Sequence, residues 1–580
     1  MLKLCAITQG GFDLSKKTPR IFTPIESFTD LYTKTGKQFN DKVLFRYFSK
    51  EGSIDTLNYG QFKNKIERIA AGLDSLGLTG KRIALIGETH PDWLASHIAT
   101  ISIGSVIIPL DKELVTDEIA NFLNKSEADA FIFSRSFNKK FDAIREKATT
   151  IKYYIPMDMD GSVFSCAESV VDLATVSDSG QRKLAERGYT LPQNTDRDKM
   201  SAMLFTSGTT GTSKCVMLSE NNLTSCINSC CATVDFSSND VLLSVLPIHH
   251  TYECACTLAA ANYGAEVCIN DSLKNVLRNL NTFRPTGMAV VPLFVNTFYK
   301  RIWDEARKKG KDDILKKGMT VAGITKKFGL DISQNLFKEV LSAFGGRLSK
   351  IVCGGAAMDP EMVKNFGIFG ITIVEGYGIT ECSPLISVSP YYRQKFGSVG
   401  PAVPSCTVKI VDPSPDEDGR EIGEIAVKGT NVMLGYYMDK EATDEVLDEE
   451  GWFKTGDLGY MDKDGYIFIT GRKKNVIILN NGKNVFPEEI EEYLYKIDII
   501  NECVVTGREN DLGEVVLTAV VYPAFEKFQG KELPEIADEV KARILEVNKI
   551  LPSFKQIRNV EIKKTEFEKT TTKKIKRFTV

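Results

Sequence analysis

Hydrophobic and polar residues alternate with two different periods along the first part of the chain. Consecutive apolar residues indicate buried strands, and apolar residues three or four apart, such as Phe62, Ile66, Ile69 and Leu73, indicate a helix. The elements expected here are, in chain order, a hairpin over 43–48 and 53–59, a helix over 59–76, a strand over 82–87, a helix over 92–103 and a strand over 106–109. Strands that alternate with helices predict a parallel, doubly wound α/β sheet.

The same alternation continues to about residue 390 and then changes. After 397, glycines recur among short β-rich runs, which predicts an antiparallel sheet or a small β-barrel over about 390–471. Further on, apolar runs alternate with helical patterns at 487–495 and 534–551, which predicts a small α+β domain. We therefore expect two domains, a large N-terminal one over 1–471 with doubly wound sheets and a C-terminal one over 472–580.

Composition and charge exclude several classes of protein. A length of 580 residues is too great for one hydrophobic core, and a net charge of −3 leaves no basic footprint for nucleic acid. The 13 cysteines include no C-x-x-C pair and the four histidines show no zinc-ligand spacing, so free thiols in a reducing compartment are expected. The N-terminus lacks the apolar core of a signal peptide, and no apolar stretch reaches the roughly 20 residues that span a bilayer. These features predict a cytoplasmic location.

One hydroxyl-rich turn has the strongest candidate chemistry. Residues 206–214 read T-S-G-T-T-G-T-S-K and follow an apolar run that predicts a strand. Glycines let backbone N–H groups turn toward one point, while the hydroxyls and Lys214 add donors and a positive charge, which suits a polyphosphate. The spacing is not that of the G-x-x-x-x-G-K-[ST] loop, and the alternative is a surface loop without a ligand. Asn221 and Asn222 are expected to cap a helix that ends near Cys230.

Other strand ends supply groups that suit a nucleotide. Small residues at 354–357 let a flat ring approach the backbone, and the string E-G-Y-G-I-T-E at 375–381 offers Tyr377 for stacking on that ring. Thr380 can donate to a phosphate oxygen, and the carboxylate of Glu381 is a hard oxygen ligand for Mg²⁺. Asp457, in G-W-F-K-T-G-D-L-G, can accept both hydroxyls of a ribose. Each string alone is also compatible with ordinary turns.

Taken together, six strings in this order resemble the adenylate-forming superfamily, which holds acyl- and aryl-CoA synthetases, peptide-synthetase adenylation domains and firefly luciferase. The resemblance covers nearly the whole chain. The H-H-T-Y-E string at 249–253 and a long insertion around 300–327 look most like long-chain fatty acid:CoA ligases. The resemblance implies that ATP, with Mg²⁺, converts a carboxylic acid to an acyl-adenylate and pyrophosphate, and that the acyl group then passes to CoA.

The resemblance also implies a role for each matched residue. The nucleotide-binding residues would be Thr206, Ser207, Gly208, Thr209, Thr210, Gly211, Lys214, Gly355, Ala356, Ala357, Gly376, Tyr377, Gly378, Asp457 and Arg472. The catalytic residues would be Lys574, Glu381, Thr380 and His250, with Glu381 also holding Mg²⁺. Gly482 and Lys483 would line the tunnel for the pantetheine arm of CoA, and Lys474 would lie in a hinge over 472–475 about which a mobile C-terminal lid turns.

The end of the chain departs from the family at one position. Relatives end in K-T-x-x-G-K-I-x-R, which aligns with residues 569–577, but the glycine of that pattern is Lys573 here. The choice of catalytic lysine therefore lies between Lys573 and Lys574, and the positions of Ile575 and Arg577 favour Lys574.

Several alternatives stay open. The acyl acceptor could be an acyl carrier protein, and an idle acyl-nucleotide binder or a luciferase-like oxygenase would share the scaffold, although Lys574 and Glu381 argue against an idle protein. Residues 300–327 hold ten Lys or Arg and four Asp or Glu; they could rest weakly on an anionic membrane, but their thin apolar face favours a solvated helical insertion. The string G-L-D-S-L at 72–76 matches the attachment motif of carrier proteins, yet it lies in a helix that leads into a strand. The length of the acyl chain is left open.

Overall fold

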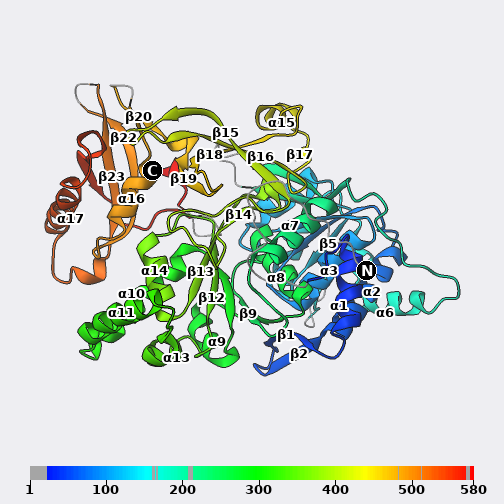
Figure 1. Ribbon diagram of the computed structural model, residues 1–580. Coiled ribbons are helices and arrows are strands. Elements are labelled where there is room, and N and C mark those ends of the chain that lie inside the picture. The colour runs from blue at the N-terminus through cyan, green and yellow to red at the C-terminus, as the bar shows by residue number, and fades with distance from the viewer. Residues whose placement is uncertain are drawn as a thin grey trace. The chain divides into compact units, whose positions relative to one another are not determined.

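The protein has a mixed α/β fold, seen here in a computed structural model (Figure 1). The structure describes residues 22–159, 164, 167–206, 213–480, 483–510, 513–569 and 575–580. Their contacts divide the chain into two compact units. The first unit holds the described residues up to 206 together with 213–407 and 427–453, and the second holds 408–426 and the described residues of 454–580.

The first unit contains an eight-stranded sheet with the order β14-β13-β12-β11-β9-β10-β1-β2. Its strands are β1 (Val43–Phe48), β2 (Ile54–Asn58), β9 (Val241–Ser244), β10 (Glu266–Ile269), β11 (Gly287–Val290), β12 (Lys350–Gly354), β13 (Thr372–Gly378) and β14 (Leu385–Val388). The strands from β13 to β1 are parallel, and the two edge strands pair antiparallel with their neighbours. The central strands are apolar on both faces because helices cover both sides, which is the usual state of a parallel sheet.

A second sheet of the same unit has seven strands in the order β17-β8-β7-β4-β3-β5-β6. Its strands are β3 (Arg82–Ile86), β4 (Val106–Leu110), β5 (Ala130–Phe133), β6 (Tyr153–Pro156), β7 (Met200–Thr206), β8 (Lys214–Ser219) and β17 (Gly435–Tyr436). The strands from β7 to β6 are parallel, whereas β8 pairs antiparallel with both β7 and β17. The hairpin and the doubly wound arrangement expected for the first part of the chain are thus confirmed, but the return strand β8 was not foreseen.

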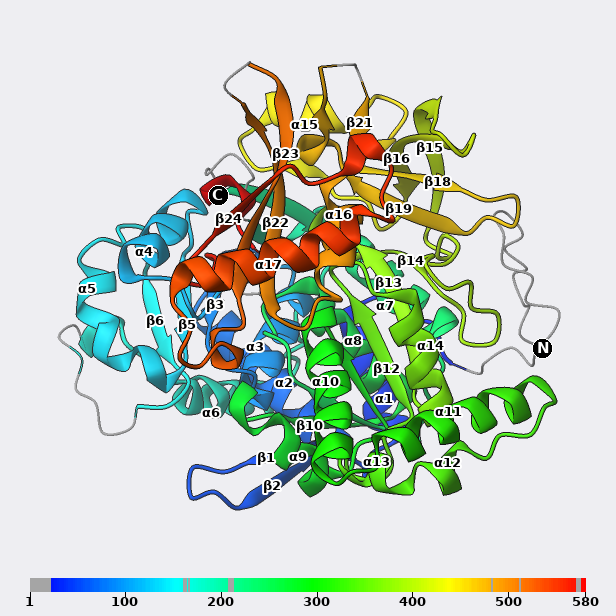
Figure 2. The ribbon, with the colours of Figure 1, turned by 90° about the vertical axis from the view of Figure 1, so that its left-hand side faces the viewer.

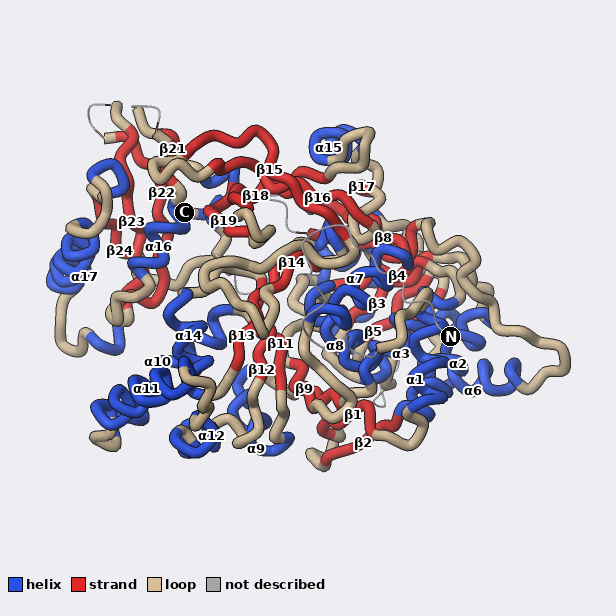
Figure 3. The backbone as a smooth tube through the Cα atoms, in the orientation of Figure 1, coloured by secondary structure: helices blue, strands red, loops and turns tan. Residues whose placement is uncertain are grey.

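Helices surround both sheets, and two of them, α7 and α8, lie between the sheets (Figure 3). The helices of this unit are α1 (Phe28–Gln38), α2 (Tyr59–Ser75), α3 (Pro91–Ser102), α4 (Thr116–Lys125), α5 (Phe141–Arg145), α6 (Leu173–Leu184), α7 (Glu220–Thr233), α8 (Thr251–Tyr263), α9 (Val276–Phe283), α10 (Pro292–Lys308), α11 (Asp312–Lys327), α12 (Ser333–Leu336), α13 (Lys338–Ser342), α14 (Pro360–Phe369) and α15 (Lys440–Val446). The carrier-type serine, Ser75, ends α2, and its hydroxyl donates to the carbonyl of Ala71 at 2.9 Å.

The expected cap of α7 was wrong by two residues. The helix begins at Glu220, and Ser219 is its N-cap because the Ser219 hydroxyl accepts from the backbone N–H of Asn222 at 3.1 Å. Asn222 returns the bond through its side chain, which accepts from the N–H of Ser219 at 2.8 Å. This reciprocal capping box satisfies two amide groups at the end of the helix, so Asn222 supports the start of α7 from within the helix.

In the second unit, the region expected to form an antiparallel sheet or a small β-barrel is an open four-stranded sheet, with the order β15-β16-β18-β19, and not a closed barrel. These strands are β15 (Cys406–Pro415), β16 (Glu421–Gly429), β18 (Phe453–Met461) and β19 (Ile467–Arg472), and most of their residues belong to this unit. Among the described residues β15 and β19 remain edges, because these two strands do not pair with each other to close the sheet.

The rest of the second unit is an α+β fold, as expected. A three-stranded sheet of β22 (Ile500–Glu509), β23 (Val515–Pro523) and β24 (Asn559–Ile562) packs against α16 (Pro487–Leu494) and α17 (Leu533–Asn548), and Figure 2 shows α17 running across it. The core of this fold includes Ile490, Leu517, Ala519, Val540 and Ile544. A short pair, β20 (Ile477–Ile478) and β21 (Asn484–Val485), precedes α16. Within the described part of the chain, no helix combines the length and the apolar composition needed to cross a bilayer.

Candidate active site

The hydroxyl-rich turn connects two paired strands. Thr206 ends β7 and Lys214 begins β8, and these two residues are direct partners in the antiparallel pairing. The Thr206 hydroxyl donates to the carbonyl of Lys214 at 3.4 Å. Five of the predicted phosphate-binding residues, Ser207, Gly208, Thr209, Thr210 and Gly211, lie outside the described residues. The structure therefore places Thr206 and the cation of Lys214 opposite each other at the end of the β7–β8 pair, which we call the base of the turn.

Beside this base, three side chains from distant parts of the sequence form one polar cluster. The Lys214 ammonium lies over the ring of Tyr436, 4.5 Å from its centroid. The Tyr436 hydroxyl donates to Oε1 of Glu381 at 3.0 Å, and the backbone carbonyl of Glu381 accepts from the N–H of Met433 at 2.8 Å. Burial, reinforced by the Glu381 charge, raises the pKa of Tyr436, so the phenol stays a hydrogen-bond donor at neutral pH. We call Lys214, Tyr436 and Glu381 the phosphate-side cluster.

Small residues next to this cluster allow backbone segments to approach closely. Gly354 and Gly376 are partners in the parallel pairing of β12 and β13, and a Cβ on Gly354 would lie 3.0 Å from the carbonyl oxygen of Gly376. A Cβ on Gly378 would lie 1.9 Å from the carbonyl oxygen of Pro384, so no larger residue fits there. Gly355, in the left-handed region with φ of 91°, opens an exposed loop.

The predicted nucleotide residues of this part differ in exposure. Gly355, Ala356 and Ala357 are exposed, and Gly376, Gly378 and Thr380 are half-buried. Tyr377, predicted to stack on a base, is buried. Thr380 and Glu381 share the short 3₁₀ turn η5 (Thr380–Cys382), which places their side chains one residue apart beyond the end of β13.

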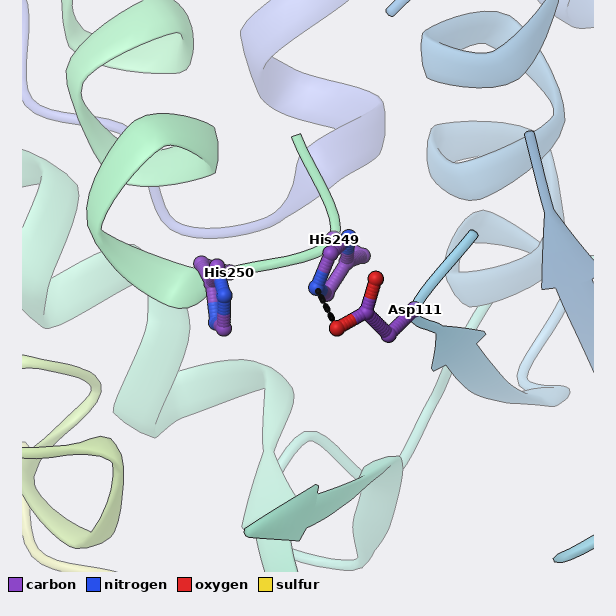
Figure 4. A group of neighbouring side chains, drawn as sticks. All are labelled: Asp111, His249 and His250. Atoms are coloured by element: carbon purple, nitrogen blue, oxygen red, sulfur yellow. Dashed lines mark ion pairs between the residues drawn. The ribbon is translucent and has the colours of Figure 1, made fainter. Parts of the chain in front are cut away.

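A second group of polar side chains gathers where α8 begins. His250 is the N-cap residue of α8, and its ring lies 4.2 Å from that of His249, centroid to centroid. Nε2 of His249 lies 3.5 Å from Oδ2 of Asp111, the residue that directly follows β4 (Figure 4). The Tyr252 hydroxyl donates to the carbonyls of Val290 and Val352, at 3.2 and 3.0 Å, which ties the start of α8 to β11 and β12.

An apolar cavity adjoins His249 between α7, α8 and the seven-stranded sheet. Its lining includes Leu204, Ile227, Ile248, Ala255 and Leu258. With a volume of about 30 Å³ it has room for only one or two water-sized groups. His97 also lines it, and burial lowers the pKa of His97 to about 4, so this imidazole is neutral.

In the second unit, the two residues predicted for ribose lie side by side. Asp457 on β18 and Arg472 at the end of β19 are partners in the antiparallel pairing, and Nε of Arg472 lies 2.7 Å from Oδ1 of Asp457. Asp457 is only 5% exposed, and this guanidinium compensates the charge of its buried carboxylate. The next residue, Lys473, pairs with Glu424 at 2.7 Å. Lys474, predicted for the hinge, lies in the 3₁₀ turn η6 (Lys473–Asn475).

The predicted CoA and tail residues are described only in part. Gly482 and Lys574 lie outside the described residues. Lys483 is paired with Glu417 at 2.7 Å, and its ammonium lies 4.0 Å from the ring centroid of Phe554. The residues that flank the tail lysine are anchored, because Lys569 and Ile575 form a β-bridge and Arg577 forms an ion pair with Glu491 of α16.

Comparison with known proteins defines the class. A model described as AMP-binding enzyme matches residues 32–437, and a second, described as AMP-binding enzyme C-terminal domain, matches residues 474–580. The chain belongs to the AMP-binding enzyme family. Two of its relatives are 28% identical to it: "Long-chain-fatty-acid--CoA ligase FadD15" of Mycobacterium bovis, over 89% of each chain, and "Long chain acyl-CoA synthetase 6, peroxisomal" of Arabidopsis thaliana, over 88% of this chain and 76% of the relative.

Solved structures share the fold. The anthranilate CoA ligase AuaEII in complex with anthranoyl-AMP superposes with a TM-score of 0.74 at 18% identity, over 96% of this chain and 97% of that one. ATP-bound MatB from Rhodopseudomonas palustris gives a TM-score of 0.71 at 24% identity, over 95% and 98%. The expected α/β fold of adenylate-forming enzymes is therefore confirmed.

Two residues of these clusters were not identified from the sequence. Tyr436 lies in a G-Y-Y string with no motif of its own, and only the pairing of β17 with β8 brings it to Lys214 and Glu381. Asp111 follows an apolar strand, and its position after β4 is the only signal: side chains that follow parallel strands gather at one edge of a sheet.

Proposed function

We propose that this protein is an AMP-forming acid–thiol ligase that activates a medium- to long-chain fatty acid with ATP and transfers the acyl group to CoA. The observation that carries the proposal is the phosphate-side cluster, in which the cation Lys214 and the acid Glu381 meet on Tyr436 at the base of the hydroxyl-rich turn. Family membership supports it, and so do the names of relatives such as the ligase FadD15.

In the first half-reaction a carboxylate oxygen of the fatty acid attacks the α-phosphorus of ATP. The new P–O bond replaces the bond to pyrophosphate, which leaves with its electron pair. Negative charge gathers on the phosphoryl oxygens, so donors and cations stabilise the transition state most where those oxygens lie. We assign residues 206–211 and Lys214 to the β- and γ-phosphates, Thr380 and Lys574 to the α-phosphate, and Asp457 and Arg472 to the ribose.

The residues present fit the Mg²⁺ that the family implies. Glu381 presents a carboxylate whose Oε1 accepts the Tyr436 hydroxyl, and carboxylate oxygens are the ligands that Mg²⁺ prefers. Bound there, the ion would neutralise charge on the phosphates. Tyr436 would hold the carboxylate in place from its other side, because its phenol remains protonated.

In the second half-reaction the CoA thiol attacks the acyl carbonyl and AMP leaves. We assign His250 to the acyl site and the thiol's approach, and Gly482 and Lys483 to the pantetheine arm. Because the thiol needs the space that Lys574 occupied, we propose that residues 472–580 act as a lid that turns about Lys474, against an N-terminal domain of residues 1–471.

Substrate and acceptor are tested together by an AMP-release screen. Acids from acetate to stearate and benzoate are offered with CoA or with an acyl carrier protein as competing acceptors. We expect the highest kcat/KM with saturated acids of medium to long chain and with CoA. Turnover only with benzoate, or only with the carrier protein, would overturn that part of the proposal, and no AMP from any acid would overturn the ligase itself.

The tail lysine separates the two half-reactions. Lys574→Ala removes the cation assigned to the α-phosphate, so we expect pyrophosphate exchange to fall by about 10²–10³-fold, the range for loss of one transition-state donor. Thioester formation from supplied acyl-adenylate should be retained. Lys573→Ala is the matched control. Equal loss of both half-reactions in Lys574→Ala, or loss only in Lys573→Ala, would contradict the assignment.

The basic segment at 300–327 is proposed to be a solvated insertion. It forms α10 and α11, and several of its cations pair with nearby acids, including Lys309 and Lys311 with Glu339 at 2.9 and 3.0 Å. Contact with an anionic membrane would have to displace such pairs. Vesicle binding that weakens as salt rises would overturn this interpretation.

A further inference from the structure

We propose that Asp111, His249 and His250 form a binding site for a divalent transition-metal ion, for which Zn²⁺ is the best fit. The three side chains come from two separate parts of the chain, the end of β4 and the start of α8 (Figure 4). One potential ligand atom from each lies within 4.8 Å of the other two. Two imidazoles and one carboxylate are a ligand set that holds zinc with a position open for water or substrate.

The distance between His249 and Asp111 favours a shared ion over a direct hydrogen bond. Nε2 of His249 is buried and has no hydrogen-bond partner among the described residues. Its separation of 3.5 Å from Oδ2 of Asp111 exceeds the roughly 2.7–3.2 Å of an N–H···O hydrogen bond. In a tetrahedral site with zinc bonds of about 2.0–2.1 Å, neighbouring ligand atoms lie about 3.3–3.4 Å apart. The observed spacing is close to that value.

The carboxylate is already oriented for such a site, and the two rings are close neighbours. Oδ1 of Asp111 accepts from the backbone N–H of Glu113 at 2.9 Å, which leaves Oδ2 on the side of His249. The two imidazole rings lie 4.2 Å apart, centroid to centroid, at an angle of 42°. A ligand fixed by a second hydrogen bond loses less conformational freedom when a metal binds, so this arrangement strengthens binding.

Nearby thiols do not compete for the ion. Cys254 of α8 is buried, and burial raises the pKa of its thiol to about 12. Its sulfur does not belong to the group of ligand atoms that lie within 4.8 Å of one another, which comes from Asp111, His249 and His250. The histidines and Asp111 are therefore the ligands that an ion entering this region would meet.

The effect on activity rests on the proposed function. A lone pair of His250 that coordinates an ion is no longer available to the acyl group or the thiol. We expect Zn²⁺ to inhibit thioester formation and a chelator to restore it. The site would then make the ligase sensitive to free zinc.

Binding is tested on the full chain without ATP, acid or CoA. Protein stripped with a chelator is titrated with Zn²⁺ by calorimetry, and with Co²⁺ by visible absorption, which separates imidazole and carboxylate ligands from thiolates. We expect one ion to bind with no thiolate charge-transfer band. Asp111→Asn and His249→Gln should each weaken it by at least about 10-fold. His90→Gln is the matched control, because His90 caps α3 outside the cluster, and it should bind as the wild type does.

Several outcomes would overturn the site. These are no ion bound by the wild-type protein, a thiolate spectrum, or wild-type affinity in both cluster variants. Circular dichroism of each variant guards against misfolding, and Asp111→Glu keeps a carboxylate if Asp111→Asn does not fold. The proposed function is judged separately: zinc that binds but leaves thioester formation unchanged would count against the role of His250 and not against the metal site.

Discussion

Two acids in each unit contrast in the partners that hold them. In the first unit these partners are hydroxyls: Tyr436 donates to the half-buried Glu381, and Ser244 donates to the buried Glu253. In the second unit two buried acids pair with guanidinium groups, Asp457 with Arg472 and Glu491 with Arg577. A hydroxyl satisfies an oxygen but leaves the charge of a carboxylate uncompensated, whereas a guanidinium cancels it.

The difference is visible in the pKa values of the two buried glutamates. Burial raises the pKa of Glu253 to about 8, so this carboxyl is largely protonated at neutral pH. Burial also raises the pKa of Glu491, but the charge of Arg577 opposes it and the value is about 7. Glu253, with a hydroxyl partner, is therefore largely protonated at neutral pH, whereas Arg577 opposes the protonation of Glu491 and ties its own segment to α16.

The largest effect is expected for Glu381, where the question is whether adenylation requires the negative charge of its carboxylate. Glu381→Gln keeps the size of the side chain and an acceptor for Tyr436 but removes the charge assigned to Mg²⁺. We expect adenylation to fall by about 10²–10³-fold with little change in melting temperature. Pyrophosphate exchange over a range of Mg²⁺ concentrations measures this. Near wild-type exchange would show that the carboxylate is only structural, and Glu361→Gln, an exposed acid of α14, is the control.

The next largest effect is expected in the pH dependence of the free energy of unfolding, to which Glu253 contributes. Its folded pKa of about 8 is above the unfolded value, so the folded state binds the proton more tightly and stability falls as pH rises from about 5 toward 8. Glu253→Gln mimics the neutral acid, removes this fall and should stabilise the protein by about 1–3 kcal/mol near neutral pH. Urea unfolding at both ends of the range measures it, and parallel pH profiles for variant and wild type would contradict the pKa assignment.

The third prediction concerns Arg577, whose guanidinium pairs with the buried carboxylate of Glu491. Arg577→Met leaves Glu491 buried without its cation, and we expect a loss of about 2 kcal/mol, modest because the arginine is partly exposed. The loss should be larger near pH 9 than near pH 6, because at the lower pH the carboxyl can take up a proton instead. Thermal unfolding at the two pH values checks this. The double variant with Glu491→Gln should recover much of the loss; no recovery would mean that the arginine acts elsewhere.

The smallest effect is expected for the phenol of the phosphate-side cluster. Tyr436→Phe keeps the ring under Lys214 and removes only the hydrogen bond to Glu381, so adenylation should fall by about 10-fold, as for one hydrogen bond to a charged group. KM for ATP and the Mg²⁺ dependence should shift together if the tyrosine orients the carboxylate. Tyr437→Phe, at the adjacent position, is the control, and equal effects in both variants would argue for a general packing role.

Much of the fold follows from the periodicity of the sequence. The apolar runs at 82–87 and 106–109 and the helical spacing of 59–76 are local signals, and their elements form as expected. The strand β8 was missed because its residues follow the glycine-rich turn without a distinct apolar alternation. The β-barrel expectation failed because strand content does not determine how many strands pair or whether a sheet closes.

The candidate site was predictable only where a motif carries its own chemistry. Glu381 and Asp457 lie in specific strings, but their partners depend on pairing over long sequence distances. Arg472 meets Asp457 through the register of β18 and β19, and Tyr436 reaches Glu381 through the pairing of β17. The four histidines do not have the sequence spacing of zinc ligands. In the fold, however, Asp111 at the end of β4 lies beside His249.

The hairpin of β7 and β8 has a consequence for how an anion can be held at its turn. In loops that lead into a helix, the aligned peptide dipoles of the helix add positive potential at the phosphate. Here the turn returns into a strand, and α7 begins only at the far end of β8. An anion held at this string would receive no help from the dipole of α7 and would rely more on the ammonium of Lys214, so its affinity should decline steeply with ionic strength.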